Sequence, residues 1–78
     1  MMYVKMDVFK ITEMREGCVY KTKRVAFHWF QLGKSPDPNV RLAPELVAQN
    51  GLPPGDYFYC STTDYVTDVR IPQGGLYA

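Results

Sequence analysis

Residues 2–11 alternate between apolar and more polar side chains with a period of two, and this pattern constrains the fold more than any other feature of the chain. Because successive side chains of a β-strand point to opposite faces of a sheet, the pattern predicts a strand with one face against a core. The core-facing set is Met2, Val4, Met6 and Val8, and the opposite set is Tyr3, Lys5, Asp7 and Phe9.

Further segments are rich in the β-branched and aromatic residues that strands favour. Residues 18–32 form either one long strand or a basic loop that leads into a strand over 25–32. The charged residues 12–17, which end in glycine, predict a turn, and the Gly/Pro-rich residues 33–39 break the chain. Later strands are expected over 57–61 and 65–71, with a short turn at 62–64, whereas the tail PQGGLYA is flexible by composition, with Leu76 and Tyr77 available to anchor it on a partner.

Residues 40–50 are ambiguous. Val40 and Leu42 suit a short strand, whereas Pro44 and Glu45 suit the first turn of a helix that Gly51 would end. We favour a single helical turn here. The following Pro54-Gly55 predicts a type II turn with glycine at the positive-φ position.

These five short β segments predict an all-β fold with at most one short helical turn, namely a five-stranded OB-like antiparallel barrel. The 78 residues are enough for a single domain, residues 1–78, with a thin core. Self-association as a homodimer, or another partner, would supply part of the missing burial.

Catalytic and metal chemistry are not expected. His28 is the only histidine and lies in an apolar aromatic run, which is typical of a half-buried strand residue. Cys18 and Cys60 lack the spacing of a zinc site, and glycine-rich phosphate loops are missing from the sequence. We therefore expect a protein that is not an enzyme and has no cofactor, no metal and no catalytic residue.

The start of the chain has no apolar signal core, and no segment is long and apolar enough for a membrane span. We therefore expect a cytoplasmic protein with two free thiols that makes no membrane contact.

The charge is unevenly distributed: residues 1–34 carry a net +4 and residues 35–78 a net −3. The basic part includes a segment that interleaves cations with rings, which is how proteins bind single-stranded nucleic acid. The alternative is that the cations solvate an exposed hairpin while the rings fill the core. The segment comprises Arg15, Tyr20, Lys21, Lys23, Arg24, Phe27, His28, Trp29, Phe30 and Lys34.

Four strings of the chain, within residues 12–72, resemble the single-stranded-DNA-binding gene V protein family of filamentous phages. They are YKTKRVAFHWF, QLGKSPDPNVRL, LPPGDYFY and YVTDVRIP. The resemblance implies a dimeric OB-like barrel that coats phage DNA during replication with low sequence specificity, in the host cytoplasm. It implies DNA contacts by Arg15, Tyr20, Lys21, Lys23, Arg24 and Trp29. The chain departs from the family in its acidic second half, and Gly17 is the only glycine of its basic hairpin.

Two other functions remain open. A small phage or mobile-element protein could bind and inhibit a host protein, with an acidic face that mimics nucleic acid, although these acids also suit solvated turns. They are Asp37, Glu45, Asp56, Asp64 and Asp68. The chain could also be a subunit of a larger assembly that docks through strand edges and tyrosines.

Overall fold

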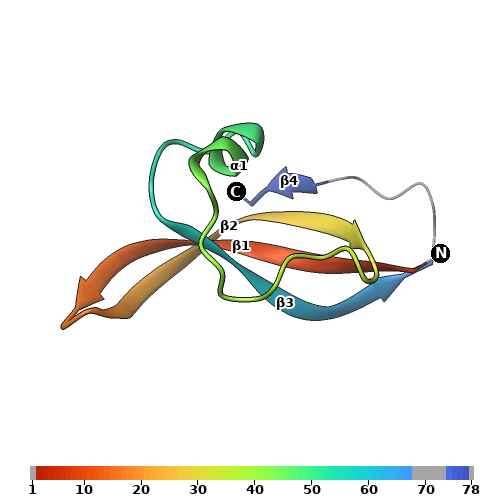
Figure 1. The fold of residues 1–78 in the computed structure, drawn as a ribbon, viewed down its shortest axis with the longest axis horizontal. Helices are drawn as coiled ribbons and strands as arrows, with labels where there is room; N and C mark the ends of the chain where they lie inside the picture. The colour runs from red at the N-terminus through yellow and green to blue at the C-terminus, as the bar shows by residue number, and fades with distance from the viewer. Residues whose placement is uncertain (1, 68–73, 78) are drawn as a thin grey trace.

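A computed structural model describes residues 2–67 and 74–77 of the chain. Its described strands form one antiparallel sheet in the order β3-β1-β2-β4, with one short helix packed against it (Figure 1). The elements are β1 (Tyr3–Arg15), β2 (Cys18–Gln31), α1 (Pro44–Gln49), β3 (Tyr57–Val66) and β4 (Gly74–Leu76).

The core lies on one face of this sheet. The predicted inward residues of β1 are buried, with Met6 1% and Val8 0% exposed, whereas Met2 at the chain start is 43% exposed. Residues from the loop before α1 and from α1 itself cover them. The buried cluster comprises Met6, Val8, Ala26, Leu42, Val47, Tyr57 and Tyr59.

The β1–β2 hairpin is longer than the sequence predicts. β1 continues to Arg15, so the predicted turn over 12–17 is wrong except at Glu16 and Gly17, whose φ angles are 52° and 78°. Positive φ at both central residues suits the twist of a two-residue hairpin turn. The charged residues of 12–15 remain in the strand because they lie at its exposed end, beyond the core. Of the two interpretations of 18–32, the long strand is correct.

Of the two interpretations of residues 40–50, the helix is correct, and in place of the short strand there is one isolated bridge between Arg41 and Phe58. The backbone N–H groups of Asn39 and Leu42 donate to the carbonyls of Tyr59 and Tyr57, so this segment pairs with the outer edge of β3. The predicted helix follows over Pro44–Gln49, and Gly51 closes it with a φ of 70°. This arrangement holds Val47 over the core.

The predicted five-stranded barrel is wrong, because the described strands form an open four-stranded sheet. β3 runs through the predicted turn at 62–64: Val4 pairs with Tyr65 and Met6 with Ser61, so three residues of β3 face Lys5 alone. The Thr62 hydroxyl donates to the Lys5 carbonyl at 3.1 Å and accepts from the Asp64 N–H at 3.1 Å. Polar residues that suggested a turn therefore build a bulge.

Three other predictions concern the strand over 65–71, the turn at Pro54-Gly55 and the C-terminal tail. Of the strand expected over 65–71, the first two residues belong to β3 and 68–71 lie outside the described residues. Gly55 does not have the positive φ that the predicted type II turn requires. The tail was expected to be flexible, but Gly74–Leu76 pairs with β2 as β4.

Gly74 explains why the C-terminal residues pair with β2 although the sequence predicted a flexible tail. A Cβ at Gly74 would lie 2.5 Å from the His28 ring and 2.6 Å from the Phe27 carbonyl oxygen. The glycine that suggested flexibility therefore allows the chain to approach β2 closely. Within the described residues, no helix has the length and apolar character needed to cross a membrane.

Candidate nucleic-acid interface

The sheet face opposite the core carries rings and cations. In the register, Phe9 lies between Phe58 and Arg24, and Asp7 lies between Cys60 and Phe27. Residues directly opposite each other in an antiparallel pair share a face, so these side chains lie on one surface with Lys5 and its neighbour Trp29. We define the aromatic face as Lys5, Phe9, Arg24, Phe27, Trp29, Phe58 and Tyr77.

The rings of this face are partly accessible. All five aromatic side chains are half-buried, in contrast to Tyr57 and Tyr59 in the core. The Phe9 and Phe58 rings stack with their centroids 5.7 Å apart and their planes at 16°. Such rings retain exposed surface on which a further planar group can stack.

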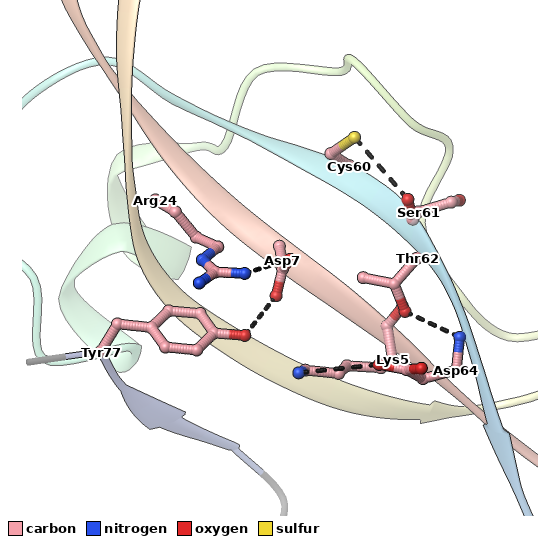
Figure 2. A network of polar contacts seen from close by, with 8 residues as sticks. All are labelled: Lys5, Asp7, Arg24, Cys60, Ser61, Thr62, Asp64 and Tyr77. Carbon is pink, nitrogen blue, oxygen red and sulfur yellow. Dashed lines mark hydrogen bonds and ion pairs between the residues drawn. The ribbon is translucent and has the colours of Figure 1, made fainter.

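A polar network lies at the centre of the aromatic face (Figure 2). The Asp7 side chain comes from the middle of β1 and is only 7% exposed as a residue. A buried carboxylate needs partners, and the Tyr77 hydroxyl donates to Asp7 Oδ1 at 2.7 Å while Arg24 Nη1 lies 3.9 Å from Oδ2. The Arg24 guanidinium also lies over the Tyr77 ring, 4.3 Å from its centroid.

Lys5 belongs to the same network. Its Nζ lies 5.1 Å and 5.5 Å from the ring centroids of Phe27 and Tyr77, and 3.9 Å from Asp64 Oδ2. A side-chain hydrogen bond with Tyr77 is the main cause that raises the pKa of Lys5 above its ordinary value, and the charges of Tyr77, Asp7 and Asp64 add to it while desolvation opposes it. Lys5 is therefore a cation throughout the neutral range.

The second part of the candidate site is the outer half of the β1–β2 hairpin, residues 12–24, which we call the arm. Figure 1 shows its tip projecting beyond the other strands, in a molecule with extents of 42 × 22 × 22 Å. The Arg15 guanidinium lies 3.7 Å from the centroid of the exposed Tyr20 ring. Glu13 pairs with both Arg15, at 2.6 Å, and Lys21, at 3.8 Å, and so partly neutralises the tip.

The structure therefore does not bring the six residues predicted to contact DNA together at one place. Arg15, Tyr20 and Lys21 meet at the arm tip, whereas Arg24 and Trp29 lie on the aromatic face. Lys23 lies on the arm opposite Lys10 of β1.

A register shift explains why the exposed face of 18–32 could not be assigned from the sequence. Val8 pairs with Ala26 but Phe9 pairs with Arg24, so Val25 is an extra residue that reverses the alternation along β2.

Sequence reasoning missed Lys5, Asp7, Phe9, Phe58 and Tyr77 as site residues. One signal was available for Phe9, because a large ring occupied the polar side of the alternation in 2–11. Asp7 gave no signal, since an acid on the outer side of a strand is usually solvated. Tyr77 could not be found because its position depends on the pairing of β4 with β2.

Of the other reactive side chains among the described residues, Cys18 lies in the arm and Cys60 lies opposite Asp7 on the aromatic side of the sheet, whereas His28 lies apart from the site. Cys18 and Cys60 are free thiols, and His28 lies on the core side of β2, with its ring 6.2 Å from that of Phe30. In residues 2–67 and 74–77, no three His, Cys, Asp or Glu side chains gather closely enough to hold a metal ion. Comparisons with protein-family models, curated proteins and solved structures found no match for this chain.

Proposed function

We propose that this protein binds single-stranded nucleic acid, without catalysis, through the aromatic face and the arm. The observation that carries the proposal is a set of half-buried rings on one face of an open sheet, with Lys5 and Arg24 among them. The rings that β1, β2 and β3 contribute are Phe9, Phe27, Trp29 and Phe58. Unpaired bases stack on such rings, and each stacked base contributes about 1–3 kcal/mol. Duplex DNA keeps its bases stacked on each other and cannot use this surface.

The arm supplies charge for the phosphate backbone. Its 13 residues contain four bases and two acids, and the side chains of Arg15 and Lys21 are 59% and 62% exposed. Cations on a projecting hairpin can contact the phosphates of a nucleic-acid strand that extends beyond the aromatic face. Neutralisation of these phosphates releases counterions. Binding is thus expected to weaken steeply as salt rises.

The more specific role that we propose is the one implied by the resemblance to the gene V protein family. In this role the protein coats phage DNA during replication, as a homodimer in the host cytoplasm, with low sequence specificity. Ring stacking and phosphate contacts both support low specificity, because neither distinguishes strongly among the bases. A thin core in a 78-residue chain supports self-association.

The alternative inhibitor function receives less support from the geometry. Of its acids, Asp37 lies in the loop between β2 and α1 and Glu45 lies on α1. Asp56 precedes β3, and Asp64 lies far along β3, where it pairs with Lys5. These described acids do not gather on one element, and Asp68 lies outside the described residues. A phosphate mimic needs its charges on one surface, so we retain the single-strand binder.

Phe58→Leu tests the stacking surface. Leucine keeps most of the apolar volume beside Phe9 but removes a ring face, so we expect the Kd for a fluorescein-labelled oligo(dT) to rise about five- to tenfold, close to the lower end of the stacking range. Fluorescence anisotropy at 50 mM salt measures this change. Tyr65→Leu, on the same strand but 53% exposed and outside the aromatic face, serves as the control. Equal affinities for the two variants and the unsubstituted protein would rule out stacking at Phe58.

A further inference from the structure

The Tyr77 side chain packs on the aromatic face against Asp7, Arg24 and Phe27, with contacts like those that a bound base would make. Its ring lies 4.3 Å from the Arg24 guanidinium and 5.2 Å from the Phe27 ring centroid, at 50° to the Phe27 plane. At the edge of the ring, the hydroxyl donates to Asp7 at 2.7 Å (Figure 2). We propose that the surface formed by Asp7, Arg24 and Phe27 is a nucleobase-binding site and that Tyr77 covers it in the free protein, an inference that rests on the single-strand binding proposed above.

The chemistry of these three side chains suits a base as well as it suits tyrosine. A guanidinium stacks on the face of either planar ring. The Asp7 carboxylate accepts a hydrogen bond from the Tyr77 hydroxyl and could accept one from the exocyclic amino group of cytosine instead. An incoming cytosine would therefore replace the stacking on Arg24 and the hydrogen bond to Asp7 that Tyr77 makes, and the buried carboxylate would keep a donor.

The backbone of the segment that carries Tyr77 is held by a short run of strand pairing. β4 has three residues, paired with Ala26, Phe27 and His28, and the Tyr77 N–H donates to the Val25 carbonyl at 2.9 Å. Release of so short an edge strand exposes little core, so it costs far less than unfolding of the sheet. Tyr77 can thus act as an intramolecular competitor whose removal raises the affinity for single strands.

Three variants of the full chain test this inference by anisotropy with labelled oligo(dC) at 50 mM salt. Tyr77→Ala removes the competing ring. Gly74→Ala keeps Tyr77 but displaces β4, because the new Cβ would lie 2.6 Å from the Phe27 carbonyl. Leu76→Ala is the control, since this side chain lies on β4 but is 60% exposed. Far-UV circular dichroism verifies that each variant is folded.

We expect Tyr77→Ala and Gly74→Ala each to lower the Kd about three- to tenfold, with Leu76→Ala unchanged. A folded Tyr77→Ala protein with equal or weaker affinity would overturn the inference, because Tyr77 would then be neutral or part of the binding surface. If the unsubstituted chain binds and Tyr77→Ala brings no gain, only this inference fails. If neither the unsubstituted chain nor any variant binds oligo(dC) or oligo(dT), the proposed function fails with it.

Discussion

Tyr57→Ala is expected to remove most of the folding stability of the protein. Tyr57 is 1% exposed, is one of the largest fully buried side chains, and donates its hydroxyl to the Pro53 carbonyl at 2.8 Å. Removal of a buried aromatic side chain costs about 3–5 kcal/mol, because contacts are lost and a cavity remains. Small domains have total stabilities of only about 5–15 kcal/mol, and a short chain lies near the lower limit.

The matched control is Tyr65→Ala on the same strand. Tyr65 is 53% exposed, so its loss should change the free energy of unfolding by less than about 1 kcal/mol. Urea denaturation, followed by far-UV circular dichroism, compares the two variants. Similar unfolding midpoints for both would mean that the core does not lie where the structure places it.

Lys21→Ala combined with Lys23→Ala is expected to weaken binding of oligo(dT) by about one to two orders of magnitude at 50 mM salt. Each phosphate contact to a single strand contributes about 0.7 to the slope of log affinity against log salt, so two lost contacts reduce the slope by about 1.4. Lys21 pairs with Glu13 only at 3.8 Å, and Lys23 faces Lys10 across the hairpin. Both charges therefore remain available to phosphates, and their loss has little cost for folding.

Lys34→Ala is the control for this pair, because it removes a cation from the loop after β2, outside the arm. Its salt slope should equal that of the unsubstituted protein. Anisotropy titrations between 50 and 200 mM salt provide the slopes. If the double variant binds with undiminished affinity and slope, the arm does not contact the backbone of the nucleic acid.

The fold could be predicted from the sequence where local pattern and burial agree. The alternation in 2–11 correctly predicted the buried face of β1. The short helix was correctly predicted from Pro44, Glu45 and Gly51. The barrel could not be excluded, because strand count and closure depend on pairing between distant segments. Residues 62–64 have turn chemistry but form a bulge, since β1 offers the Lys5 carbonyl as an acceptor for Thr62.

The candidate site was only partly predictable. The basic and aromatic composition of 18–31 identified the arm and one strand of the aromatic face. The bulge at Val25 then made the exposed face of that strand impossible to assign from alternation alone. The residues contributed by β1, β3 and the segment after β4 come together only through the sheet order β3-β1-β2-β4.

Trp29 fluorescence tests single-strand binding by the aromatic face most directly. Trp29 is the only tryptophan and lies beside Lys5 on that face, so its signal is local. We expect titration with poly(dT) at low salt to quench this fluorescence, moderate salt to reverse much of the quenching, and duplex DNA to have little effect. A folded sample whose Trp29 emission is unchanged by poly(dT) at low salt would contradict the proposed function.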